Sequence, residues 1–303
     1  MTNKLTVYGC RGSIPMVEPQ FLRYGGNTSS YVLRTDNALF FLDAGTGIRK
    51  AAAQELTGNE KKIFLVISHS HPDHIDGLGC SKLPYQRDKK AQLILSEHAY
   101  SGLYDFHSDN LFPMNIGLEM PGIDYQSPYL IRDDTVRTTI MLDDISINTL
   151  MGLHPNQNLG GSILFRFNLP HDKSVVYATD TEFDFLKNKN TKQMEPFKGA
   201  DALKKAYVHL IQNADILIAD AQYTQQEYDH KQCDKHGWGH SYIEQILELA
   251  KQGEVQEVVL THHDPGHTDA IMDEVSYCAT TCVFEHGFKG KVTMARQGLE
   301  RLL

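Results

Sequence analysis

Short apolar runs separated by turn-forming residues dominate the chain. Runs rich in β-branched and aromatic residues, bounded by Gly, Asn and Asp, are typical of strands, and the first of them predict a meander. Segments whose apolar residues recur every three to four positions are typical of helices. The predicted strands are Leu5–Tyr8, Ser30–Arg34, Leu39–Leu42, Ile63–Ile67, Ile145–Thr149, Ser162–Phe167, Val175–Ala178, Ile216–Ala219, Val258–Thr261 and Lys291–Met294. The predicted helices are Ile48–Glu55, Ala202–Gln212 and Tyr242–Gln252.

Strands and helices alternate in both halves of the chain. This order predicts an α/β fold in which two sheets pack together with helices outside. No period of about 20–50 residues repeats, which excludes a solenoid, and we expect a single domain over 1–303. Ser241 precedes Glu244 by three positions, the spacing of a capping box, so we expect the last predicted helix to begin at Ser241.

The segment at about 100–135 fits neither period. It carries aromatic and methionine side chains among Gly, Pro and Asp, and we expect an ordered insertion or lid rather than a linker. Stacking of a base on Tyr or Phe is worth about 1–3 kcal/mol, which would suit a small nucleotide beneath a lid. Packing of the segment on the protein itself is the alternative.

Composition and charge narrow the class of protein. No apolar run approaches the roughly 18 residues of a membrane span, and the N-terminal residues lack the apolar stretch of a signal peptide, so we expect a cytoplasmic protein. The five cysteines lack a C-x-x-C pair, which disfavours both a disulfide framework and a thiolate zinc site. The net charge of −9 disfavours polynucleotide binding and favours a small substrate.

Metal-ligating residues crowd into the six positions that follow the predicted strand Ile63–Ile67. The run is His69-Ser70-His71-Pro72-Asp73-His74. Imidazole and carboxylate groups are ligands that Zn²⁺ and Mn²⁺ accept, and a turn at a strand end can direct alternate side chains at one ion and the next pair at another. The loop therefore predicts two adjacent metal ions.

This His-x-His-x-Asp-His loop resembles the signature of the metallo-β-lactamase superfamily. Further motifs match in order over nearly the whole chain, namely Leu42-Asp43-Ala44-Gly45, His154, Tyr177-Ala178-Thr179-Asp180 and Thr261-His262-His263. The resemblance implies a four-layer αβ/βα sandwich. It also implies that His69, His71 and His154 hold the first metal, that Asp73, His74 and His262 hold the second, that Asp180 bridges them, and that Asp43 supports the ligands.

Several of these assignments have alternatives. His171 competes with His154, but Pro170-His171-Asp172-Lys173 is typical of a hairpin turn. His263 competes with its neighbour His262, which the family's Thr-His pattern favours. Asp43 and Asp180 both end apolar runs, where an Asp can simply turn the chain.

The metals and one further histidine indicate the reaction. Two divalent ions about 3.5–4 Å apart lower the pKa of a shared water, so hydrolysis is expected. An Asp bridge followed by a His at a helix start resembles the phosphodiesterase branch that includes tRNA 3′-end nucleases, and Gly237-Trp238-Gly239-His240-Ser241 supplies that His. There the helix dipole favours a phosphate, and the imidazole can protonate the departing alkoxide. We expect Asp73 and His240 to be catalytic, and a purely structural His240 is the alternative.

The beginning of the chain narrows the substrate. Gly9-Cys10-Arg11-Gly12-Ser13-Ile14-Pro15 and Arg23-Tyr24-Gly25-Gly26-Asn27-Thr28-Ser29 look like the start of small bacterial and phage members of this branch. Some of those, including the anti-Pycsar enzymes of phages, hydrolyse cyclic nucleotides. The glycines predict turns, and contact of Arg11 or Asn27 with substrate is a lesser hypothesis.

Three functions remain open on this basis. We expect a metal-dependent phosphodiesterase that hydrolyses a small phosphodiester, with cyclic nucleotides ahead of other substrates. An RNase Z-like tRNA 3′ endonuclease is the first alternative, disfavoured because the sequence has no basic, Gly/Pro-rich arm. A non-catalytic metal or nucleotide sensor on the same fold is the second, and the complete set of ligands argues against it.

The expected cofactors and partners follow from this hypothesis. We expect two divalent ions, Zn²⁺ ahead of Mn²⁺ or Fe. The aromatic segment offers apolar surface for a second copy, so we expect a homodimer, and we expect no membrane association.

Overall fold

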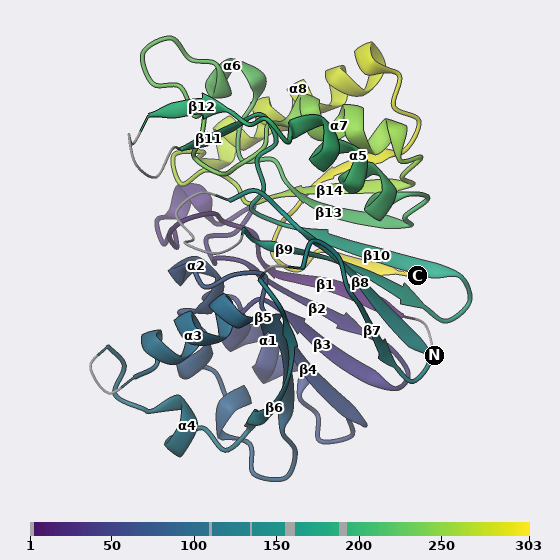
Figure 1. Ribbon diagram of the computed structural model, residues 1–303. Coiled ribbons are helices and arrows are strands. Elements are labelled where there is room, and N and C mark those ends of the chain that lie inside the picture. Colours follow the sequence, from purple (N-terminus) through teal and green to yellow (C-terminus); the bar gives the residue numbers. More distant parts are fainter. Residues whose placement is uncertain (1–2, 109–110, 134, 155–160, 188–192) are drawn as a thin grey trace. The chain divides into compact units, whose positions relative to one another are not determined.

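The computed structural model describes residues 3–108, 111–133, 135–154, 161–187 and 193–303 (Figure 1). These residues form two compact units. The first unit consists of Met1–Asp133 together with Arg296–Leu303, and the second unit is Asp134–Ala295. Each unit is built around one large mixed sheet of seven strands.

In the sheet of the first unit, antiparallel strands at one edge give way to parallel strands. β16 to β3 pair antiparallel, and β3 to β6 pair parallel. The strands, in the order in which they pair, are β16 (Glu300–Leu302), β1 (Lys4–Gly9), β2 (Ser30–Arg34), β3 (Ala38–Leu42), β4 (Lys62–Val66), β5 (Ala91–Ser96) and β6 (Ile123–Ile131). The helices are α1 (Ile48–Glu55), α2 (Pro72–Ile75), α3 (Glu97–Phe106) and α4 (Ile116–Glu119), with short 3₁₀ turns at Pro19–Phe21, Leu78–Cys80 and Leu83–Tyr85.

The apolar runs of the sequence form the core of this unit. All of β3 is buried, as a run of apolar residues in a central strand requires. α1 packs against β1 and β2, and α3 packs against β5 and β6. The aromatic segment belongs to the same core. Leu103, Ile116 and Met120 are buried in it, and β6 extends the sheet as a parallel edge strand.

The described part of this aromatic segment packs on its own unit, which favours the alternative interpretation of its aromatic side chains. Tyr100, Phe106, Phe112 and Tyr125 lie against the core. Residues 109, 110 and 134 of the segment lie outside the described residues.

The sheet of the second unit has the same plan. β7 to β10 pair antiparallel, and β10 to β15 pair parallel. The strands, in the order in which they pair, are β15 (Lys291–Met294), β14 (Glu257–Thr261), β13 (Ile216–Asp220), β10 (Lys173–Ala178), β9 (Ile163–Leu169), β8 (Ile145–Met151) and β7 (Thr139–Leu142). A separate hairpin joins β11 (Phe185–Lys187) and β12 (Met194–Pro196). The helices are α5 (Ala200–Ile211), α6 (Gln225–Tyr228), α7 (Ile243–Gln252) and α8 (Asp269–His286).

α5, α7 and α8 contact one another in that order and cover the second sheet through β8, β14 and β15 (Figure 1). The expected start of α7 was wrong. This helix begins at Ile243, and no capping box forms because Ser241 Oγ donates to the carbonyl oxygen of Thr181 while Glu244 accepts from the amide of Gln225. The side chains of Ser241 and Glu244, which the local pattern assigned to the capping box, are thus hydrogen-bonded to other segments of the chain.

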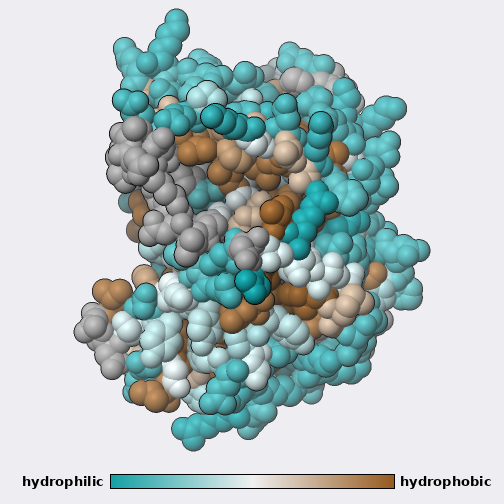
Figure 2. Space-filling view, viewed as in Figure 1, coloured by the Kyte–Doolittle hydropathy of each residue, from teal (hydrophilic) through white to brown (hydrophobic). Residues whose placement is uncertain are grey.

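The surface in Figure 2 is mostly hydrophilic, with hydrophobic residues gathered in smaller groups. Among the described helices, none combines the length and the apolar character that crossing a membrane would require.

Candidate metal centre

The candidate residues follow the carboxyl ends of parallel strands. In the second unit, Ala178 of β10 pairs with Ala219 of β13, which pairs with Leu260 of β14. Asp180, Asp220 and His262 therefore emerge at the same edge of that sheet. In the first unit, Asp43 follows β3, and the loop that carries His69 to His74 follows its parallel neighbour β4. This edge is where open α/β sheets bind ligands.

Three of these residues have left-handed backbone conformations. The φ angles are 58° for Asp43, 43° for Asp180 and 61° for His262. Such conformations cost free energy in residues other than glycine and cluster at functional sites. The sequence left open whether Asp43 and Asp180 are turn residues or functional acids. In the structure each of them turns the chain and also directs its carboxylate into a polar cluster.

Asp43 organises the cluster of the first unit. Its Oδ1 accepts from the amide of Ser68 at 2.7 Å, and its Oδ2 accepts from Ser68 Oγ at 2.8 Å and from His74 Nδ1 at 2.7 Å. Nδ1 of His74 carries the donated proton, and Nε2, the other ring nitrogen, faces Asp73 Oδ2 at 3.3 Å. Asp43 thus lies where a carboxylate that orients a metal-ligating histidine is expected.

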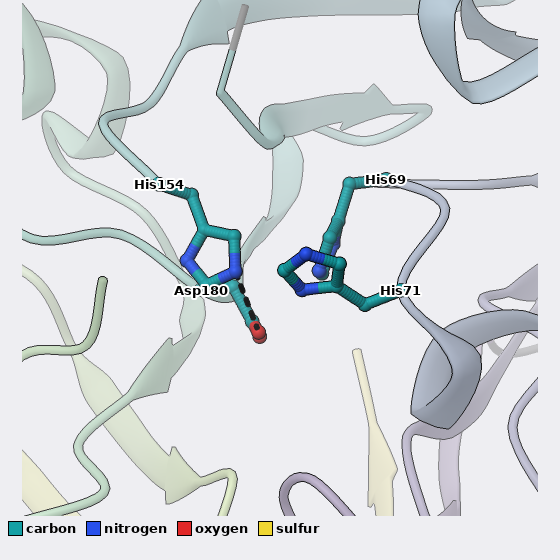
Figure 3. A group of neighbouring side chains, drawn as sticks. All are labelled: His69, His71, His154 and Asp180. Atoms are coloured by element: carbon teal, nitrogen blue, oxygen red, sulfur yellow. Dashed lines mark ion pairs between the residues drawn. The ribbon is translucent and has the colours of Figure 1, made fainter. Parts of the chain in front are cut away.

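His69 and His71 lie beside this pair. Their rings meet edge to face with centroids 4.6 Å apart (Figure 3), and their nearest ligand atoms lie within 4.8 Å. Nδ1 of His69 lies 3.1 Å from Ser68 Oγ. The hydroxyl proton of Ser68 is already donated to Asp43, so Ser68 Oγ is left to accept from His69 Nδ1. His69 therefore also presents Nε2.

Asp180 is the centre of the cluster in the second unit. Its Oδ2 lies 3.9 Å from His154 Nε2 (Figure 3), and its Oδ1 lies 3.2 Å from His262 Nε2. Each carboxylate oxygen thus faces a different histidine, as a bridging carboxylate would. Nδ1 of His154 donates to the carbonyl oxygen of Gly239 at 2.8 Å, and Nδ1 of His262 donates to Gln222 Oε1 at 3.1 Å. Both rings are held so that Nε2 points at Asp180.

His240 lies in the same cluster, although it stands before α7 rather than in its first turn. Its ring stacks on His262 with centroids 4.7 Å apart, and its Nδ1 donates to Asp220 Oδ2 at 3.0 Å. Asp220 was not predicted from the sequence. The signal was present, because Asp220 ends an apolar strand just as Asp43 and Asp180 do. Asp220, His240 and His262 can also hold a metal as a group.

Glu182 is a second residue that the sequence analysis missed. It is buried, and it accepts from the amides of Gly237 and Gly239 at 2.7 and 2.8 Å. Burial raises the pKa of its carboxyl to about 7, against the lowering effect of these hydrogen bonds and of the Tyr228 hydroxyl. Glu182 fixes the loop that leads to His240.

The competing candidates have contacts of a different kind. His171 is exposed at a hairpin turn with φ of 63°. His263 donates Nε2–H to the carbonyl oxygen of Ala295 at 2.8 Å, so it is bound to the backbone through the nitrogen that the other histidines present. Arg11 is fully buried, donates to the carbonyl oxygen of Gly25 and lies over the Phe21 ring, which indicates a structural role.

The donor sets of both units fit a divalent metal. Ligand atoms that share a tetrahedral Zn²⁺ at about 2.0–2.2 Å stand roughly 3.3–3.6 Å apart. The separations of 3.3 Å between His74 and Asp73 and of 3.2 Å between His262 and Asp180 are close to that spacing, and the 3.9 Å between His154 and Asp180 is slightly longer. Every donor is an imidazole nitrogen or a carboxylate oxygen, the set that Zn²⁺, Mn²⁺ and Fe accept.

Comparison with known proteins identifies the fold. The family described as "Anti-Pycsar protein Apyc1" matches residues 23–209, more than half of the chain. A ribonuclease Z of Archaeoglobus fulgidus is 23% identical, over 86% of this chain and 87% of its own. The metallo-β-lactamase fold protein YhfI of Bacillus subtilis aligns with a TM-score of 0.65 at 17% identity, over 100% of this chain and 99% of its own. Unliganded yeast PDE1 aligns with a TM-score of 0.66 at 12% identity, over 100% and 99%.

The chain therefore has the metallo-β-lactamase fold, and the predicted α/β class is confirmed. The groups of His and Asp side chains that could hold a metal ion include the predicted residues His69, His71, Asp73, His74, His154, Asp180 and His262. The metal count and the individual ligand roles stay predictions.

Proposed function

We propose that this chain, which belongs to the Anti-Pycsar protein Apyc1 family, is a dinuclear-metal phosphodiesterase that hydrolyses a small phosphodiester, with cyclic nucleotides ahead of other substrates. One observation carries most weight. His69, His74, His154 and His262 each have Nδ1 engaged by a neighbouring group, and Nε2 of His74, His154 and His262 faces an Asp carboxylate oxygen at 3.2–3.9 Å. Outer partners that fix the tautomer in this way are typical of metal-ligating histidines.

The ligand roles follow the sequence resemblance. In this proposal His69, His71 and His154 would hold the first ion, Asp73, His74 and His262 would hold the second, and Asp180 would be shared by both. Zn²⁺ is the first candidate, ahead of Mn²⁺ and Fe. When bound, two such ions supply a water of lowered pKa as nucleophile and charge to stabilise the phosphoryl oxygens.

In this proposal His240, with Asp220 beside it, protonates the leaving group. As the P–O bond breaks, the leaving oxygen takes a proton from His240 Nε2. The imidazolium form that gives up this proton is stabilised beside the Asp220 carboxylate, which holds Nδ1–H at 3.0 Å. The stacking of His240 on His262 places this proton donor next to a proposed metal ligand.

The metal-dependent reaction is tested with bis-p-nitrophenyl phosphate in the presence of Zn²⁺ or Mn²⁺. The wild-type protein should cleave it, and Asp73→Ala and His71→Ala should abolish most of that activity. His171→Ala is the matched control, because it removes an exposed histidine at a hairpin turn. Unchanged rates in Asp73→Ala and His71→Ala would show that the site is assigned wrongly.

The archaeal relative supports a second candidate, an RNase Z-like tRNA 3′ endonuclease. The net charge of −9 argues for the smaller substrate, since polynucleotide binding draws on cationic side chains. Precursor tRNA and 3′,5′-cyclic nucleotides, compared under the same metal, separate the two. A protein that binds metal and nucleotides tightly but hydrolyses neither substrate would instead be a sensor.

A further inference from the structure

The loop that leads into His240 is fixed from within the second unit. The carboxylate of Glu182 accepts from the amides of Gly237 and Gly239, and Gly239 in turn accepts from His154 through its carbonyl oxygen. His236 stacks on Phe185 with ring centroids 4.1 Å apart. This backbone is thus bonded directly to a proposed metal ligand.

Trp238 projects from this fixed loop into solvent. Gly237 and Gly239 on either side have φ angles of 69° and 91°, which L-residues rarely adopt. The Trp238 side chain is 52% exposed, whereas His240, two positions later, is 8% exposed. An indole so exposed on a tightly bonded loop is unusual, because tryptophan is on average highly buried.

A cation accompanies the indole. Nζ of Lys235 lies 4.3 Å from the centroid of the Trp238 ring and 5.6 Å from that of Tyr223. The Tyr223 ring lies 6.3 Å from the ring of His240. Lys235 thus lies over the rings of both Trp238 and Tyr223, and Tyr223 lies next to His240, the proposed proton donor. The ammonium lies over the indole ring, and about half of the residue's surface stays exposed to solvent.

We propose that Trp238 and Lys235 form the nucleotide-recognition element of this site. The indole stacks on the nucleobase, and the Lys235 ammonium attracts the phosphodiester anion toward His240. This inference rests on the proposed phosphodiesterase function and adds the class of substituent that the site recognises, an aromatic base. Base stacking is indifferent to base identity because every base has a π-face, so purine and pyrimidine nucleotides should both bind.

The chain offers a direct reporter, because Trp238 is its only tryptophan. Intrinsic tryptophan emission of the metal-loaded wild-type protein is measured during titration with a hydrolysis-resistant 3′,5′-cyclic nucleoside phosphorothioate. The emission should be quenched in a saturable way. The concentration that gives half-maximal quenching should equal the concentration at which the same compound half-inhibits phosphodiester cleavage. Ribose 5-phosphate, which lacks a base, should leave the emission unchanged. Inhibition without any change in emission would overturn the inference.

Substitution separates recognition from packing. Trp238→Ala should raise KM for a cyclic nucleotide by about 10- to 100-fold with kcat changed less than about threefold, and Trp238→Phe should recover most of the affinity. Tyr277→Ala, which removes another exposed aromatic side chain, should leave KM unchanged. Lys235→Met should raise KM and weaken its salt dependence, whereas Lys231→Met should not.

The outcomes distinguish the two proposals. Hydrolysis of cyclic nucleotides with unchanged KM in Trp238→Ala would remove the recognition role and leave the phosphodiesterase intact. Saturable quenching by the cyclic nucleotide in a protein that hydrolyses no phosphodiester would support the recognition role and overturn the proposed reaction.

Discussion

The Nδ1 atom of His240 lies 3.0 Å from Oδ2 of Asp220. Since a carboxylate can only accept, Nδ1 carries the proton, and Nε2 is the nitrogen that exchanges a proton with the substrate. The pair has the geometry of an oriented acid whose charged form is stabilised by its neighbour.

His240→Ala should therefore slow the hydrolysis of substrates with poor leaving groups by on the order of 10²–10⁴. A p-nitrophenolate ester leaves readily without a proton, so its rate should fall far less. Comparison of kcat for a cyclic nucleotide and for bis-p-nitrophenyl phosphate measures this contrast. Equal losses on both would point to phosphate binding, and loss of bound metal would make His240 a ligand, as its place beside Asp220 and His262 also allows.

Asp220→Asn should lower kcat through His240 alone. The carbonyl oxygen of Asn can take the place of Oδ1, which accepts from the amide of Gln222, whereas its NH₂ group takes the place of Oδ2 and can neither accept from His240 Nδ1 nor stabilise an imidazolium. In a His240→Ala background the same substitution should then have little further effect on kcat, because both changes remove one function. A double-mutant cycle on cyclic-nucleotide hydrolysis measures the coupling. Fully additive losses would show that Asp220 acts independently of His240.

Asp43→Asn should weaken metal binding without removing a ligand. The substitution takes away the carboxylate that accepts from His74 Nδ1, and changes of this kind cost about 10- to 100-fold in metal affinity. Titration against a competing chelator gives the affinity. Asp172→Asn is the control, since Asp172 also has a positive φ, of 55°, but lies at an exposed turn. Equal affinities in the two variants would contradict the role of Asp43.

His107 should make the first unit sensitive to acid. Burial lowers the pKa of His107 below its ordinary 6.5, against the raising effect of the hydrogen bond to the Leu103 carbonyl oxygen. Between the lowered pKa and 6.5 the unfolded chain binds more protons than the folded one. Neutral His107 therefore makes its full contribution to the free energy of unfolding above pH 6.5. This contribution is lost as the pH falls from 6.5 through the lowered pKa of the folded state.

Urea unfolding of the chelator-treated protein at about pH 5, 6 and 7 tests this prediction. His107→Leu should lose less stability than wild type on acidification, because leucine takes up no proton. His171→Ala should retain the wild-type dependence. Parallel curves for His107→Leu and wild type would show that His107 does not titrate in this range.

Strands with strong local signals were predictable from the sequence, and residues fixed by tertiary contacts were not. The bounds predicted for β2, α1 and β15 match the structure. α8 was missed because its β-branched and cysteine residues blur the helical period, although Thr268 caps its start and Gly287, with φ of 64°, caps its end.

The same distinction between local sequence signals and tertiary contacts applies to the candidate site. The His69–His74 loop is dense enough to identify by itself. Folding brings Asp220 to His240, 20 positions away, and Glu182 to Tyr228 and Gly237, 46 and 55 positions away, so the sequence pattern alone does not show these pairs. The preference for His262 over His263 came from the family pattern. His263 is hydrogen-bonded to the backbone of Ala295, which is consistent with this preference, and the choice between the two histidines stays a prediction. The homodimer stays a prediction.

The most direct measurement of the central claim is the rate at which the Zn²⁺- or Mn²⁺-loaded protein hydrolyses a panel of 3′,5′-cyclic purine and pyrimidine nucleotides, with precursor tRNA assayed under the same metal. We predict conversion of the cyclic nucleotides to nucleoside monophosphates, loss of this activity in Asp73→Ala, and little cleavage of the tRNA. Specific 3′-end cleavage of the tRNA with inert cyclic nucleotides would contradict it.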